Sequence, residues 1–159
     1  MNRHEILNAK SLSPVDLNGQ MVPALLSISK STRALMGLKL AQLGFYNGQD
    51  ELLLAVVDAK PVTVSQLAQL IDVRPSTASK MLDRLVKAGL VERKTDRGDA
   101  RRSMVQITSA GLEARVQLYA LRAELEAELM PSPSRLPHDV VNTLIILSAV
   151  LKTRLNRLR

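Results

Sequence analysis

The residues in this sequence that are best suited to bind or react are basic or bear hydroxyl groups, and they lie close together. Positions 74 to 102 hold nine Lys or Arg residues against four Asp or Glu residues, which leaves +5 of the formal net charge of +7. In the same stretch, Ser76, Thr77 and Ser79 closely follow Pro75. Cationic side chains bind phosphate, and hydroxyl groups donate and accept hydrogen bonds. The chemistry indicated is polar recognition of an anion.

The residue types that most enzymes use are scarce or isolated. The sequence has no cysteine and only two histidines, His4 near its start and His138 directly after Pro137. Neither histidine is near a plausible nucleophile or carboxylate pair, and the glutamates at 124–128 are typical of a solvated face. No spacing of His, Asp and Glu is that of a metal site. We therefore expect no enzymatic activity, no metal and no cofactor.

Length and composition favour a single, mainly helical domain. The chain has 159 residues, of which 46% are hydrophobic but only 2% are aromatic, so Leu, Val, Ala and Ile must build the core. A sequence pI of about 10.1 favours a polyanionic partner. The absence of cysteine fits a reducing compartment, and no signal-peptide or bilayer-spanning pattern is visible. We expect a cytoplasmic protein that does not bind membranes.

Apolar spacing and helix-ending residues predict the elements that position the basic stretch. Thr63 and Gln66 have the spacing of a capping box, Pro75 suits a first helical turn, and Gly89 suits the residue after a helix. The predicted helices cover about residues 20–43, 49–59, 64–71, Pro75 to Gly89 and 108–130, and a last helix opens at Pro137. Strands at about 90–94 and 103–107, joined by a charged turn, predict a β-hairpin.

The order helix, turn, helix and hairpin between Thr63 and Ile107 has a physical logic. A helix that enters the major groove needs an outward face of small polar and basic groups and a rigid apolar inner face. Ala78, Leu82 and Leu85 share one face of the predicted helix, and Lys80 lies on the opposite face. This arrangement favours binding to double-stranded nucleic acid over a solvated charged surface.

Four segments resemble the multiple-antibiotic-resistance regulator (MarR) family. They are Thr63–Ala68, Pro75–Arg93, Asp99–Arg101 and Ile107–Gly111. The most specific part is Leu-Val-Lys-Ala-Gly-Leu-Val-Glu-Arg, which ends at Arg93, together with Asp99–Arg101, the wing signature. Ile107 stands where the family usually has Leu. The resemblance covers nearly the whole chain. It implies a mainly α fold with a small β-hairpin wing, in which a winged helix-turn-helix is joined to a helical dimerisation region.

The resemblance also implies domain bounds and a function. Residues 1–159 would form one MarR-type domain, with a DNA-binding lobe at 45–108 and a dimerisation region at 14–44 and 109–159. The chain would be a transcriptional regulator that binds a pseudo-palindromic operator as a homodimer, and a ligand-responsive repressor. Independent support for a dimer comes from a coiled-coil-like seam in the last helix, formed by Val141, Leu144, Ser148, Leu151, Leu155 and Leu158.

The resemblance implies DNA-binding roles for the residues that match the family's motifs. Residues expected to face base edges or nearby phosphates are Ser76, Thr77, Ser79 and Lys80, while Arg74 and Arg84 would mainly contact the DNA backbone. Arg101 matches the wing-tip arginine that enters the minor groove. Asp99 matches the acid that orients this arginine, with ordinary turn chemistry as the alternative. Arg97 and Arg102 would contact phosphate or remain solvated.

Members of the family often respond to small aromatic or phenolic anions bound between the dimer helices and the DNA-binding lobe. Candidate residues for such an effector site are Arg33, Met36, Phe45 and Tyr46. Alternatively, Met36 and Phe45 are core residues and Tyr46 anchors a loop.

An alternative function of the whole chain also stays open. The chain would then be a winged helix that contacts protein, or a protein that binds anionic surfaces through Lys152, Arg154, Arg157 and Arg159.

Overall fold

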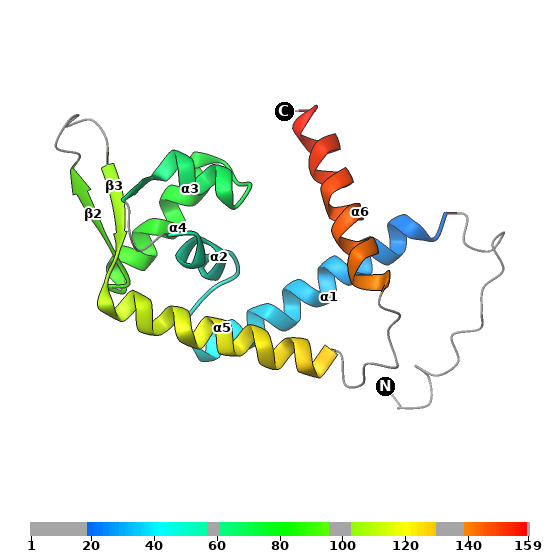
Figure 1. Cartoon of the computed structure of the whole chain (residues 1–159), viewed down its shortest axis with the longest axis horizontal. Coiled ribbons are helices and arrows are strands. Elements are labelled where there is room, and N and C mark those ends of the chain that lie inside the picture. Colours follow the sequence, from blue (N-terminus) through cyan, green and yellow to red (C-terminus); the bar gives the residue numbers. More distant parts are fainter. Residues whose placement is uncertain (1–18, 57–60, 96–102, 130–138, 159) are drawn as a thin grey trace. The chain divides into compact units, whose positions relative to one another are not determined.

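A computed structural model describes residues 19–56, 61–95, 103–129 and 139–158 (Figure 1). The elements, in chain order, are α1 (Met21–Gln42), α2 (Gln49–Ala55), β1 (Val62–Thr63), α3 (Val64–Leu70), α4 (Pro75–Lys87), β2 (Val91–Thr95), β3 (Ser103–Ile107), α5 (Ser109–Leu129) and α6 (Asp139–Asn156). The predicted fold class, mainly α with a small β-hairpin wing, is confirmed. The chain forms two compact units, Met1–Arg115 and Val116–Arg159.

The link between α1 and α2 is short and closely hydrogen-bonded. Gly44 follows the end of α1 with φ at +77°, a left-handed conformation that glycine adopts at little cost. The N–H of Phe45 then donates to the carbonyl of Leu40 over 2.9 Å. The side chains of both Leu40 and Phe45 are buried. The chain direction at the entry to α2 is thus fixed by buried apolar groups and by the backbone.

Helix α2 ends earlier than predicted. The expected end was near residue 59, but the helix stops at Ala55 and Val56 adopts extended backbone angles. Val56 is a poor continuation of a helix because its β-branched side chain loses rotamer freedom against the preceding turn. Val56 is fully buried, so its side chain contributes to the core in the extended conformation.

The predicted capping box opens α3. The hydroxyl of Thr63 accepts a hydrogen bond from the N–H of Gln66 over 3.2 Å, and the N–H of Thr63 donates to Oε1 of Gln66 over 2.9 Å. Both interactions satisfy N–H groups that a helix start leaves without intrahelical partners. Because Leu67 and Ala68 are buried one turn later, this cap also fixes how α3 packs.

We expect Thr63→Ala to lower the free energy of unfolding by about 1 kcal/mol, the usual cost of losing a threonine cap. Chemical denaturation followed by circular dichroism measures this. Ser65→Ala is the matched control, because Ser65 is exposed inside the same helix and alanine has the higher helix propensity. Equal stabilities for Thr63→Ala and the parent would show that the cap contributes nothing.

A three-stranded antiparallel sheet in the order β1-β3-β2 supports the hairpin. Strands β2 and β3 pair from Val91 opposite Ile107 to Thr95 opposite Ser103. The two-residue strand β1, which the sequence analysis did not predict, pairs Val62 with Val105. Along β3, Val105 and Ile107 are buried while the residues between and before them are more accessible, the alternation expected when one face of a sheet covers a core.

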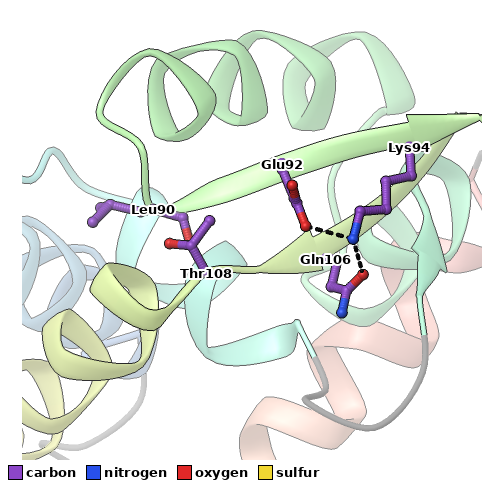
Figure 2. Close-up of polar contacts among 5 residues, drawn as sticks. All are labelled: Leu90, Glu92, Lys94, Gln106 and Thr108. Carbon is purple, nitrogen blue, oxygen red and sulfur yellow. Dashed lines mark hydrogen bonds and ion pairs between the residues drawn. The ribbon is translucent and has the colours of Figure 1, made fainter.

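The base of the hairpin is joined to α5 by a polar contact and a very close packing contact. The hydroxyl of Thr108 lies 2.7 Å from the carbonyl oxygen of Gly89 and accepts a hydrogen bond from the N–H of Gly111 over 3.0 Å. The N–H of Thr108 donates to the carbonyl of Leu90, and these two residues lie beside each other in Figure 2. Gly111 packs directly against the backbone of Leu90. The start of α5 is thereby positioned by the hairpin.

Helix α5 continues into the second unit, which also contains α6. Along α5 the buried residues Ala114, Leu118, Leu121 and Leu125 recur at spacings of four and three, which is a single helical stripe. Helix α6 has no buried residue. Across the ranges that the structure describes, no helix is both long enough and apolar enough to span a membrane.

Candidate nucleic-acid interface

Helix α4 separates its polar and apolar residues onto different faces. Ala78, Leu82 and Leu85 are at most 1% exposed and pack in the core with α2, α3 and β2. The predicted recognition residues on the other side are exposed, except for the half-buried Ser79; they are Arg74, Ser76, Thr77, Ser79, Lys80 and Arg84. Pro75 is the first helical residue, as predicted. The buried face holds the helix while the polar face remains available to a partner.

The turn before α4 has a strained residue that the sequence analysis did not single out. Asp72 has φ at +55°, a conformation that L-residues other than glycine adopt infrequently and that aspartate tolerates better than most. The N–H of Val73 donates to the carbonyl of Ala68 over 2.9 Å, which closes the turn onto α3. This turn sets the angle between α3 and α4.

Two basic side chains of β2 near this face have defined partners. Arg93 of β2 donates from Nη2 to Oδ1 of Asp83 on α4 over 2.6 Å, which links the recognition helix to the hairpin. In Figure 2, Lys94 lies between Glu92, at 2.7 Å, and Oε1 of Gln106, at 2.9 Å. Each contact pairs one base with one acid, so neither contact changes the net positive charge of the region.

Arg84 has a different kind of neighbour. Its guanidinium carbon lies 5.4 Å from the centre of the Tyr46 ring, a cation–π distance. Sequence reasoning assigned Tyr46 to an effector site or to a loop anchor and did not connect it with Arg84. The two residues are 38 positions apart, and no sequence pattern relates them.

The predicted wing-tip residues lie outside the described part of the chain. These residues are Arg97, Asp99, Arg101 and Arg102. Strands β2 and β3 pair as far as Thr95 opposite Ser103, so the two ends of the connecting segment are held at neighbouring strand positions.

A cavity of about 490 Å³ lies in the first unit between α1, the α1–α2 link, α2 and α4. Its lining residues are Ile28, Ser29, Thr32, Arg33, Met36, Asn47, Gly48, Asp50, Glu51, Val73 and Met81. Two of the four effector candidates, Arg33 and Met36, are among them. Phe45 is in the core, only 5% exposed, and Tyr46 is 66% exposed and does not line the cavity.

The two residues before α2, Asn47 and Gly48, pack closely against α1 and α4 beside this cavity. The side-chain amide of Asn47 donates to the carbonyl of Arg33 over 3.1 Å, which fixes the link against α1. Gly48 has φ at +91°, and a Cβ there would lie 2.7 Å from Cε of Met81. Met81 therefore connects the cavity with the recognition helix. Sequence reasoning missed Asn47, Gly48 and Met81 because helix packing alone brings them together.

Titratable side chains are not grouped in the way a metal would require. Within the described ranges, no three His, Asp or Glu residues lie close enough to hold a metal ion.

The fold and the interface define a winged helix: a helix-turn-helix formed by α3 and α4, followed by the β2–β3 hairpin. The model of the MarR family matches residues 51–102, which include this helix-turn-helix. A mutant of MarR from E. coli, complexed with operator DNA, is 25% identical, with 88% of this chain and 99% of that chain covered and a TM-score of 0.71. Wild-type apo MarR from E. coli is 27% identical, with 81% and 94% covered and a TM-score of 0.63.

A third solved structure, the transcriptional regulator BldR from Sulfolobus solfataricus, is 22% identical. It covers 89% of this chain and 99% of its own, with a TM-score of 0.72, and it supports the fold alone. A comparison with curated proteins gives no significant match. Together these findings confirm the predicted resemblance to the MarR family, whose model matches the winged-helix lobe of this chain.

Proposed function

We propose that the chain is a transcriptional regulator that binds a specific double-stranded DNA sequence as a homodimer. The observation that carries this proposal is the α4 helix, whose exposed hydroxyl and cationic face is supported by fully buried Ala78 and Leu82. Such a face matches the donor and acceptor pattern of major-groove base edges. Further support comes from a structural relative that was solved with operator DNA.

Within this proposal the exposed residues divide by task. Ser76, Thr77 and Lys80 are small or extended polar groups on the outward face and would read bases or bind nearby phosphates. Arg74, directly before α4, and Arg84, in its last turn, would bind the backbone. The domain division predicted from the sequence stays part of the proposal: a DNA-binding lobe at 45–108 and a dimerisation region at 14–44 and 109–159.

The binding proposal is tested by selecting bound duplexes from fragments of the parent genome and sequencing them. We expect one recurrent, pseudo-palindromic sequence with half-sites about one helical turn apart, because a two-fold dimer presents two α4 helices. Recovery of fragments without any shared sequence would contradict sequence-specific binding.

Dimer formation is supported by apolar surface that a single chain leaves exposed. On α6, the seam residues Val141, Leu144, Leu151 and Leu155 are between 43% and 50% exposed. On α1, Leu26 is 66% exposed. Large apolar residues exposed along a helix typically mark an interface between proteins. We propose that a second copy of the chain covers both helices.

We expect light scattering to give a mass twice the 17.5 kDa of one chain. The double variant Leu151→Glu and Leu155→Glu places charges in the seam and is expected to shift the mass towards that of a monomer. Thr153→Glu is the matched control, since Thr153 lies on the opposite side of α6 from the seam. A parent protein that is monomeric at micromolar concentration contradicts the proposed dimer.

We further propose that a small aromatic or phenolic anion regulates DNA binding from the cavity beside α1. The volume of about 490 Å³ is within the range of small-molecule sites. Arg33 supplies a cation, Met36 an apolar surface, and Met81 a direct connection to α4. A ligand that prefers one position of α4 would change DNA affinity by shifting the population of that state.

A saturating aromatic acid is expected to stabilise the folded protein by about 2.7 kcal/mol at one hundred times its Kd, visible as a rise in Tm. Arg33→Ala should remove this rise, because the carboxylate loses its charged partner. Lys30→Ala removes the same charge from an exposed α1 position outside the cavity lining and should leave the rise intact. If the rise survives Arg33→Ala, the proposed site is wrong.

A further inference from the structure

Tyr46 is held by its backbone in a position where its side chain must face solvent. The preceding Phe45 is buried, and the N–H of Tyr46 donates to Oε1 of Gln49 over 2.8 Å. The N–H of Gln49 in turn donates to the carbonyl of Tyr46 over 3.0 Å, and Gln49 itself is only 5% exposed. This reciprocal pair ties Tyr46 to the first turn of α2. Its side chain is 66% exposed, and the ring forms a platform at the surface.

The guanidinium of Arg84 lies over that platform. Its central carbon is 5.4 Å from the ring centre. A guanidinium over a ring face is attracted by the ring quadrupole, and one ring face cannot take up all five N–H donors of the group. N–H groups of Arg84 therefore remain available for an outside acceptor.

Arg93 differs from Arg84 because its partner is an acid. Arg93 donates to the carboxylate of Asp83 at 2.6 Å, so its charge is offset and one of its donors is occupied. The Tyr46 ring offers Arg84 no formal charge, so the stack orders the long side chain without neutralising it. An arginine that is ordered in advance loses less conformational entropy when it binds a phosphate.

We propose that Tyr46 is a positioning residue that orders Arg84 for contact with a DNA phosphate. The proposal rests on the DNA-binding function proposed above and assigns to the α1–α2 link a part in that binding. Tyr46 acts through Arg84, so its contribution depends on the arginine being present. The expected benefit is roughly two- to fivefold in affinity, because part of the entropy cost of immobilising a long side chain on binding is already met in the free protein.

The first measurement needs no DNA. In the NMR spectrum of the free protein, the side-chain protons of Arg84 should show a ring-current shift that persists in Tyr46→Phe and disappears in Tyr46→Leu. A shift that is absent from the parent protein, or unchanged in Tyr46→Leu, overturns the stack and leaves the proposed DNA-binding function unaffected.

The second measurement is the affinity for the selected duplex in a double-mutant cycle. Tyr46→Phe should bind like the parent, Tyr46→Leu should bind about two- to fivefold more weakly, and Tyr46→Leu should have no further effect in an Arg84→Ala background. Arg84→Ala alone should lower the salt slope by about one, and Tyr46→Leu should leave the slope unchanged.

Three results would overturn the proposal while the parent protein still binds the duplex. They are an unchanged affinity for Tyr46→Leu, a loss in Tyr46→Phe as large as in Tyr46→Leu, and an undiminished effect of Tyr46→Leu without Arg84. Failure of the parent protein to bind any duplex would instead remove the proposed function on which this inference rests.

Discussion

Arg101→Ala is expected to weaken binding of the selected duplex by about tenfold to a hundredfold. By resemblance, Arg101 would be the wing-tip arginine that enters the minor groove, and removing an arginine that contacts a base edge typically costs about 1–3 kcal/mol. The strand pairing that ends at Thr95 and Ser103 holds both ends of the segment that carries it. Competition gel shifts at a fixed salt concentration measure the change.

Arg154→Ala is the matched control for Arg101→Ala. It removes the same charge from an exposed position on α6, within the basic cluster that an anionic-surface binder would use. We expect Arg154→Ala to leave the affinity for the selected duplex within about twofold of the parent. The reverse result, a large loss for Arg154→Ala and none for Arg101→Ala, would favour the alternative in which the basic residues of the last helix bind anionic surfaces.

Gly111→Ala is expected to lower the free energy of unfolding by at least about 2 kcal/mol. At an ordinary helical position this substitution would stabilise the protein, because alanine has the higher helix propensity. At Gly111, however, a Cβ would overlap the carbonyl oxygen of Leu90 and lie 2.7 Å from Cγ1 of Ile107. The obstructing group is main chain at the base of the hairpin, so the backbone must shift, and overpacking of this kind typically costs 1–3 kcal/mol or more.

Chemical denaturation measures the effect of Gly111→Ala. The control is Ser109→Ala, at an exposed position in the same turn of α5, which is expected to change stability by less than about 0.5 kcal/mol. We also expect Gly111→Ala to weaken DNA binding, because the hairpin and α5 meet at this contact. A variant that is as stable as the parent would show that the junction is more adaptable than its geometry indicates.

Much of the fold was predictable because the local signals agree with one another. The Thr63 and Gln66 capping box, Pro75 at the first position of α4 and Gly89 after its end each specify a boundary through chemistry that acts within a few residues. The hairpin strands were also located to within one residue. These elements belong to the winged-helix lobe, where the sequence is most strongly patterned.

What the sequence did not reveal depends on contacts between distant positions. Strand β1 has two residues and exists because Val62 pairs with Val105, 43 positions later. The stack of Tyr46 on Arg84 and the approach of Met81 to Gly48 likewise follow from packing of separate helices. Arg33 and Met36 were identified as effector candidates from the resemblance, and the burial of Phe45 agrees with its alternative interpretation as a core residue.

The central claim is that two α4 helices, presented by a symmetric pair of chains, read one DNA sequence. The most direct test is a titration of the selected duplex and of a permuted duplex of equal length and composition at about 150 mM salt, with the mass of the complex measured in parallel. We predict two chains per selected duplex and a preference of about a thousandfold or more over the permuted one. Equal affinity for both duplexes, whatever its strength, would contradict the claim.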